Sequence, residues 1–392
     1  MSDSSMNEPT SGLVPRLRFP EFREAGEWEE KPLGKLCEIL NNRRQPITSN
    51  NRVSGPYPYY GASGIVDYVA DFIFDERLVL MGEDGAKWGA FEKTAFIAEG
   101  KYWVNNHAHV LKPRGLSDVL LEAILTMIDV SPYITGAAPP KLTLGKLKKI
   151  PITVPASVLE KQKIAACLSS LDALIAAQAD KLDALKTHKK GLMQQLFPRE
   201  GETVPRLRFP EFREAGEWNT KLVKGLISTV TPPKKLTSNL YEDEGRFPVI
   251  DQSQSYICGW TDDEEALVSC DVPLLVFGDH TCVLKIVDQP FAQGADGIKI
   301  IKANREVEPA FLYQYLLHNP VGMESYKRHF STLKEKIVVY PDINTGEQQK
   351  IAACLSSLDA LIAAQADKLD ALKTHKKGLM QQLFPSPEAV AA

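Results

Sequence analysis

Clusters of amide and basic side chains are the residues of this sequence that could do chemistry. Asparagine, glutamine and arginine read the edges of bases, and lysine contacts phosphates, so the chemistry they suit is contact with nucleic acid. Short clusters occur in both halves of the chain. The candidate DNA-contacting residues are Asn41, Arg43, Arg44, Ser63, Lys87, Asn105, Asn106, His107, Lys141, Lys234, Lys235, Gln252, Ser253, His280, Lys299, Lys327 and Arg328.

Net charge limits how far these clusters can be interpreted. The chain carries 46 lysines and arginines against 50 acidic residues, a net charge of −4, so any nucleic-acid contact must rest on local patches. Each cluster alone is more typical of a solvated surface than of a DNA contact. Together, in two different regions, they favour two separate DNA-reading surfaces, and the negative total suits a chain that takes phosphate contacts from partner subunits.

Catalytic signatures are missing from the sequence. There is no G-x-x-x-x-G-K-[ST] phosphate loop, no G-x-S-x-G and no Asn-Pro-Pro-aromatic quartet, and Gly82–Gly85 is typical of a turn. His107 and His109 could supply half of a metal site, but a lone histidine pair is more typical of plain surface, so we expect no metal.

The cysteines and the hydropathy of the sequence bear on the cellular compartment in which the protein works. The six cysteines form no C-x-x-C pair, which favours reduced thiols and a cytoplasmic protein. The N-terminus has no apolar signal core, and no run of 18 apolar residues predicts a membrane span.

Two internal repeats organise the chain around the variable regions. A strap of 15 residues, VPRLRFPEFREAGEW, occurs at Val14–Trp28 and again at Val204–Trp218, where its prolines exclude a regular helix. A segment of 37 residues is identical at Gln162–Pro198 and Gln349–Pro385. The strap and the long segment therefore occur twice, and each pair flanks a variable region of different sequence.

The long repeat predicts two helices with an apolar seam. Alanine and leucine are abundant, and apolar residues follow a 4–3 heptad spacing until a closing proline. About 36 residues give a rod of roughly 55 Å. The chain connectivity favours antiparallel pairing of the two copies, with pseudo-two-fold symmetry. The predicted seam consists of Leu168, Leu171, Ile175, Leu182, Leu185, Leu355, Leu358, Ile362, Leu369 and Leu372.

Polar residues interrupt this seam at equivalent positions of both copies. Gln178 and Gln365 form one such pair of positions, and Lys189 and Lys376 form the other. Polar seam residues can fix register at some cost in stability, or they can lie at a wet edge of the seam. The sequence leaves both interpretations open.

The two variable regions predict one fold with different surfaces. Strand-like runs occur at Phe72–Met81 and His107–Pro113, and Leu116–Ile128 predicts a helix capped by Ser117 or Asp118. Equivalent landmarks recur in the second region, such as LLVFG at Leu274–Gly278 for LVLMG at Leu78–Gly82. We expect an α+β protein in which two mixed α/β domains are separated by two long helices that form an antiparallel coiled coil.

The repeats also set the expected boundaries. The predicted order is a disordered leader (1–13), a first domain with its strap (14–156), a central helix (157–198), a second domain with linker and strap (199–343), a C-terminal helix (344–385) and a tail (386–392).

Several motifs together resemble the specificity subunit of Type I restriction–modification systems. They are the PRLRFPEF strap, YYGASGIVDY at Tyr59–Tyr68, WVNNHAHVL at Trp103–Leu111, FAQGADGIKI at Phe291–Ile300 and the QKIAACLSSLDALI helix starts. Identity of the two helices over 37 residues departs from the family, in which the two regions are often only similar.

The resemblance implies a DNA-binding chain without catalysis of its own. Each domain would be a target recognition domain for one half of an asymmetric bipartite target in double-stranded DNA, and the helices would set the spacer. Two modification subunits would dock, carry S-adenosylmethionine and methylate adenine, and restriction subunits would add ATP- and Mg-dependent translocation and cleavage. The rival hypotheses are a duplicated protein-binding scaffold and a self-contained nuclease or methyltransferase. The missing motifs and the length argue against the second.

Overall fold

The chain forms two compact units in a computed structural model. The structure describes residues 13–137, 139–269, 271, 273–295, 297–323 and 327–385, so the expected tail and all but the last residue of the expected leader lie outside it. Unit 1 comprises Met1–Ala179 together with Asp367–Ala392, and unit 2 comprises Asp180–Ala366. Each unit therefore takes one variable region and a part of each long helix.

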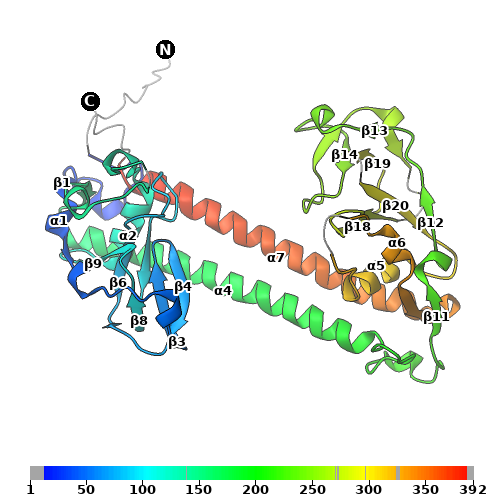
Figure 1. The fold of residues 1–392 in the computed structure, drawn as a ribbon. Coiled ribbons are helices and arrows are strands. Elements are labelled where there is room, and N and C mark those ends of the chain that lie inside the picture. The colour runs from blue at the N-terminus through cyan, green and yellow to red at the C-terminus, as the bar shows by residue number, and fades with distance from the viewer. Residues whose placement is uncertain are drawn as a thin grey trace, which may run out of the picture. The chain divides into compact units, whose positions relative to one another are not determined.

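Unit 1 contains two four-stranded sheets, visible beside helix α2 in Figure 1. The first has the order β2-β9-β6-β7 and is antiparallel throughout. The second has the order β4-β3-β8-β5. The strands are β1 (Glu29–Pro32), β2 (Cys37–Ile39), β3 (Ser54–Gly61), β4 (Gly64–Val69), β5 (Phe74–Asp75), β6 (Leu78–Gly82), β7 (Ala95–Ala98), β8 (Lys101–Val104), β9 (Ala108–Pro113) and β10 (Pro151–Val154). The helices of this region are α1 (Leu33–Leu36), α2 (Asp118–Met127) and α3 (Leu144–Leu147).

Strand β6 is the centre of the unit 1 core. All five of its residues are buried, and successive side chains point to opposite faces of the sheet. Val79 and Met81 pack in the cluster that includes Leu120 of α2. Leu78 and Leu80 pack in a second cluster with residues of the other sheet. Burial on both faces explains why LVLMG is a continuous apolar run rather than an alternating one.

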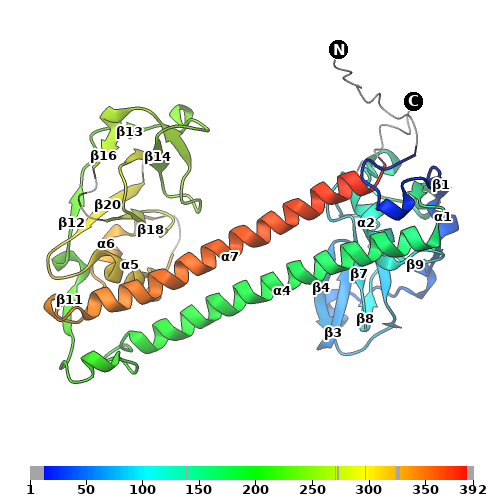
Figure 2. The same cartoon turned by 180° about the vertical axis from the view of Figure 1, so that it is seen from behind.

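Unit 2 repeats this plan. Its sheets have the orders β12-β20-β17-β18 and β13-β19-β14-β15, with β16 paired to β19, and helix α5 (Pro309–His318) packs where α2 packs in unit 1. Figure 2 shows α5 and α6 (Phe330–Lys334) beside this sheet. The strands are β11 (Asn219–Leu222), β12 (Ile227–Val230), β13 (Lys235–Leu236), β14 (Phe247–Ile250), β15 (Gly259–Thr261), β16 (Leu267–Val268), β17 (Leu274–Gly278), β18 (Leu284–Val287), β19 (Phe291–Gly294), β20 (Ile298–Ala303) and β21 (Ile337–Tyr340).

The long helices are α4 (Val158–Leu196) and α7 (Glu347–Leu383). In unit 1 the start of α4 packs on the end of α7, since Leu168 shares a core cluster with Met380 and Asp172 pairs with Lys376. In unit 2 the end of α4 packs on the start of α7, where Lys189 Nζ lies 2.6 Å from Asp359 Oδ1. The helical segments therefore run antiparallel within each unit, whereas a supercoil along the whole seam stays a prediction.

Burial agrees with the predicted seam. In the middle of α4, the seam residues Leu171, Ile175, Leu182 and Leu185 are partly buried, whereas most of their neighbours are exposed. Lys189 and Lys376 each form an ion pair across to the other helix, and their partners Asp359 and Asp172 are partly exposed.

The strap ties both helices together in each unit. In unit 1, Arg18 forms a two-bond ion pair with Glu160 near the start of α4, with Nε–Oε1 and Nη2–Oε2 distances of 2.7 Å. The neighbouring Leu17 N donates to Gln382 O near the end of α7 at 2.9 Å. Unit 2 makes the same two connections through Arg208 and Glu347, and through Leu207 and Gln195.

Most of the expected elements form, with one difference in a strand. Helix α2 begins after Ser117, whose side chain accepts from Leu120 N, and LVLMG and LLVFG are the central strands. The run Phe72–Met81 is not one strand, because β5 ends at Asp75 and β6 begins at Leu78. The break falls at Glu76, whose carboxylate is turned toward Arg43 and Lys112.

Candidate nucleic-acid interface

Several strands of unit 1 end at one edge of its sheets. Strands β2 and β6 both pair antiparallel with β9, with Ile39 opposite Leu111 and Gly82 opposite Ala108, so they end where β9 begins. In the second sheet β3 and β8 are parallel and end together at Gly61 and Val104. We call this the loop edge of unit 1. It consists of residues 41–45, 62–63, 83–87, 105–107 and 141–142.

The sequence-predicted candidates of the first half gather at this edge, although they come from five separate segments. Lys141 joins it because Leu142 N donates to Glu83 O at 2.7 Å. What the sequence did not indicate is that most of these side chains are bound to other parts of the protein.

Arg44 and Lys141 are engaged by one buried carboxylate. Arg44 Nη1 donates to Glu83 Oε2 at 2.5 Å, and Lys141 Nζ lies 2.8 Å from Glu83 Oε1. Burial by itself would raise the pKa of Glu83, but the hydrogen bonds from Lys141 and Arg44 outweigh it and lower that pKa. The carboxylate is therefore ionised at neutral pH, and the two cations serve the fold of the edge.

His109 lies fully buried beneath this group. Its Nε2 is 2.7 Å from the carbonyl oxygen of Leu142, so Nε2 carries the proton. Its Nδ1 is 2.8 Å from Asn41 Nδ2, and Asn41 Oδ1 accepts from Val110 N, which fixes the amide as the donor to the ring. Both ring nitrogens are satisfied only by neutral histidine, and burial lowers the pKa of His109.

Other candidates at the edge are also bound. Asn105 is buried and its Oδ1 accepts from His107 N at 2.8 Å, while the His107 ring pairs with Asp84. The structure therefore brings the two histidines of the predicted pair close to different acids, Asp84 and Glu83, and no group of three potential metal ligands occurs in the described part of the chain.

Some polar side chains of the edge are exposed and make no hydrogen bond within the described residues. They are Asn42, Gln45, Ser63, Lys87 and Asn106, of which Lys87 has only a distant contact of 3.9 Å with Glu92. Asn42 lies inside the Asn41–Gln45 cluster of the sequence. These side chains are the ones that a ligand at the loop edge would meet.

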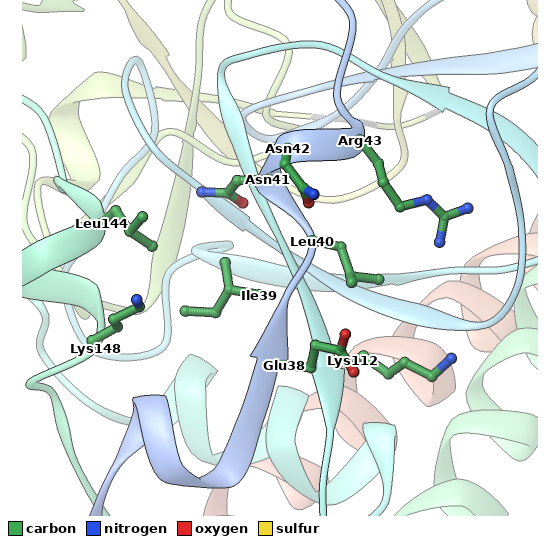
Figure 3. A pocket seen from close by; sticks show the side chains of 9 residues that line it. All are labelled: Glu38, Ile39, Leu40, Asn41, Asn42, Arg43, Lys112, Leu144 and Lys148. Atoms are coloured by element: carbon green, nitrogen blue, oxygen red, sulfur yellow. The ribbon is translucent and has the colours of Figure 1, made fainter.

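A polar groove of about 560 Å³ continues from the edge along β2. Figure 3 shows the side chains that line it, with Leu144 and Lys148 on one side, Arg43 on the other, and Asn41 and Asn42 between them. Arg43 is held by Glu76 at 2.6 Å and lies over the ring of Phe74, and Lys112 shares the same carboxylate. The basic side chains of the groove are therefore Arg43, Lys112 and Lys148. Of these three, Lys148 forms no ion pair within the described chain.

Unit 2 has an equivalent loop edge built from different residues. Gly278 of β17 lies opposite Ile298 of β20, as Gly82 lies opposite Ala108. Asp279 takes the place of Glu83, and its carbonyl accepts from His329 N at 2.8 Å, as Glu83 O accepts from Leu142 N. Lys299 stands at the register position of His109. Unit 2 thus makes the same backbone hydrogen bond at its loop edge without the ion pairs that Glu83 forms with Arg44 and Lys141 in unit 1.

The candidates of unit 2 also divide into bound and exposed groups. Lys234 pairs with Asp263 at 2.6 Å, Lys235 lies in β13, and Lys299 is partly buried in β20 with Nζ 6.0 Å from the ring of Phe330. His280 lies two residues after β17 and is partly buried, and Lys327 and Arg328 are exposed just before His329. Gln252 and Ser253 belong to the loop after β14, where the backbone of Ser253 is held by Asp251 at 2.8 Å.

A buried cation holds that loop in place. Lys285 of β18 is 5% exposed, and its Nζ donates to the carbonyl oxygens of Asp251 at 2.8 Å and Ser255 at 2.6 Å. On the other side of the loop Thr281 Oγ1 donates to Gln252 O at 2.8 Å. Nothing in the sequence marked Lys285, because a lysine in a strand is usually exposed.

No helix within the described residues is both long enough and apolar enough to cross a membrane. The described polar residues of the two edges offer amides, hydroxyls and cations at the surface. Such groups suit binding to base edges and phosphates.

Comparison with known proteins points in the same direction. Residues 25–187 match the family described as Type I restriction modification DNA specificity domain. A putative type I restriction enzyme specificity subunit of Haemophilus influenzae is 38% identical over 161 residues, which is 41% of this chain and 41% of that protein. The EcoprrI specificity subunit of Escherichia coli is 29% identical over 164 residues, 40% of this chain and 39% of that protein. These two matches thus span about two fifths of each relative.

Two further relatives cover nearly the whole chain. The MjaVIII specificity subunit of Methanocaldococcus jannaschii is 20% identical over 414 aligned residues, 94% of this chain and 93% of that protein. The crystal structure of a Type I restriction–modification S subunit from M. genitalium has a TM-score of 0.67 at 14% identity, covering 95% of this chain and 100% of that one. The latter similarity is one of fold.

Proposed function

We propose that this chain, which belongs to the specificity subunits of Type I restriction–modification systems, binds double-stranded DNA and reads a bipartite asymmetric target. Unit 1 reads one half of the target through its loop edge, and unit 2 reads the other half.

A single observation carries this proposal: the two units share identical frame contacts but have different loop edges. The strap-to-helix ion pair has the same 2.7 Å distances in both units. By contrast, Glu83, His109 and Lys141 of unit 1 are replaced by Asp279, Lys299 and Arg328 at the equivalent positions of unit 2. A duplicated frame that holds two unlike polar surfaces is what reading two unlike DNA sequences requires.

Specificity subunits are in general non-catalytic, and we infer the same for this chain. Two modification subunits would bind the helical frame, supply S-adenosylmethionine and methylate adenine, and restriction subunits would supply ATP- and Mg-dependent translocation and cleavage. Helices α4 and α7 would fix the number of unspecified base pairs between the half-sites. The net charge of −4 supports such sharing, because phosphate contacts would come in part from the partners.

The proposal is tested by binding and by methylation. The chain is co-expressed with its modification subunits, and adenine methylation is mapped across a genome with and without this gene. We expect methylation at one bipartite motif that disappears without the gene. Gel shifts of genomic fragments that show no sequence dependence, with or without the modification subunits, would instead favour a protein-binding scaffold.

A further inference from the structure

Two loops of the unit 1 edge carry exposed carboxamides that form no hydrogen bond within the described residues. Asn42 lies in the segment after β2, and Asn106 lies in the turn before β9, and both side chains are exposed. A carboxamide pairs with N6 and N7 of adenine through two hydrogen bonds, which is a contact that specifies a base. Such a contact requires that the two loops keep a fixed position relative to each other.

Arg44 connects these two loops directly. Its Nε donates to Asn41 O at 3.1 Å, and its Nη1 lies 3.2 Å from Asn106 O and 2.8 Å from Ala108 O. Each of the two free carboxamides therefore lies on, or next to, a residue whose carbonyl Arg44 holds.

Glu83 fixes Arg44 in turn. Its carboxylate, whose residue is 8% exposed, accepts from Arg44 and Lys141, and its backbone N donates to His107 O at 2.8 Å. A guanidinium has five donors in a rigid planar fork, so its direction is set once the carboxylate is in place.

We propose that Arg44, held by Glu83, is the positioning residue for base reading by unit 1, and that Asn42 and Asn106 are the side chains it positions. This proposal rests on the proposed function. Neither Arg44 nor Glu83 touches the DNA in it.

Unit 2 contains the same device in a different chemical form. Lys285 donates to the carbonyl oxygens of the 251–256 loop, which carries Gln252 and Gln254. As with Arg44, a cation shielded from water binds the backbone of a loop that presents carboxamides. The recurrence at a second, unlike edge argues that fixing the presenting loop is the purpose of both cations.

Glu83→Gln tests the proposal against a matched control. Glu306 accepts from Lys221 and Tyr340 and follows the end of β20 opposite to the loop edge of unit 2, so Glu306→Gln removes the same charge away from both loop edges. Both variants are made in the full chain, co-expressed with the modification subunits. Methylation is then measured at sites that differ by one base in either half.

For Glu83→Gln we expect discrimination against wrong bases to fall about tenfold in one half-site only, the size of one lost base contact. Asn42→Ala or Asn106→Ala should relax the same half-site, and Lys285→Met should relax the other. Glu306→Gln should leave both unchanged.

Two results would overturn the proposal. One is a Glu83→Gln chain that loses methylation evenly at all sites without a change in base preference, because that is the effect of a merely structural residue. The other is unchanged discrimination. Failure of the proposed function is distinguishable from both, since the unmodified chain would then direct no sequence-dependent methylation at all.

Discussion

The buried ion pair between strap and helix should contribute more to stability than any exposed pair in the same strap. Glu160→Gln removes the charge that compensates Arg18, although the side chains of both residues are at most 7% exposed. Removing one partner of a buried pair typically costs about 3–5 kcal/mol, because the other charge stays buried without compensation. Arg18 also donates to the carbonyl groups of Ala25 and Gly26, so we expect the lower end, about 3 kcal/mol.

The strap supplies its own control. Glu21 pairs with Lys163 at 2.8 Å, but these side chains are 45% and 52% exposed. Glu21→Gln should therefore cost about 0–1 kcal/mol. For a unit of this size, a loss of 3 kcal/mol corresponds to a fall of about 6–12 °C in the melting temperature.

Calorimetry of the full chain, combined with hydrogen exchange, can assign the loss to one unit. Glu160→Gln should lower protection at the start of α4 and the end of α7, which pack together in unit 1. Glu347→Gln should do the same in unit 2, because its pair with Arg208 has the same distance and burial. If Glu160→Gln costs no more than Glu21→Gln, the reasoning from burial is refuted.

Three further predictions concern single contacts. Unit 1 should lose stability as the pH falls from about 6.5, because burial lowers the pKa of His109, which lies beside Glu83, Arg44 and Lys141 in the folded state, whereas the unfolded chain takes up the proton at the ordinary pKa of 6.5. The urea midpoints at pH 7.5 and 5.5 should therefore differ less in His109→Gln than in the unmodified chain. An equal difference would contradict this assignment. Ser117→Ala should cost about 1 kcal/mol, since its side chain caps α2, whereas Thr143→Ala should cost less than about 0.5 kcal/mol because Thr143 makes no side-chain cap bond; equal unfolding energies would count against the cap. Lys376→Met and Lys189→Met keep the aliphatic stem but lose the pair with Asp172 or Asp359. Each should lower the free energy of unfolding in denaturant by about 0.2–1 kcal/mol, because the paired charges are partly exposed. A loss above about 2 kcal/mol would contradict this expectation.

Local sequence patterns determined the elements of this protein. The cap at Ser117, the apolar run Leu78–Gly82 and the helix-forming composition of the long repeat each act within a few residues, and the cap, the strand and the long helix form as expected. The duplication also indicated two units of one fold, since identical frames around aligned landmarks leave little choice.

Tertiary structure decided which polar residues support the loop edges and which are free. The composition of the Asn41–Gln45 cluster does not distinguish Arg44 from Asn42, because the partners of Arg44 lie 39 and 64 residues away, at Glu83 and Ala108. Lys285 was invisible for the same reason, since its acceptors lie about 30 residues earlier in the chain.

The difference between the two kinds of feature is physical. Helices, caps and strands are stabilised by neighbours in sequence, so the sequence by itself determined them. A charge is stabilised at its place only when distant segments bring an opposite charge or a set of carbonyl groups to it and exclude water. The fold therefore decided that Arg44, Lys141 and Lys285 hold loops, and that Asn42, Ser63 and Asn106 remain available to a ligand.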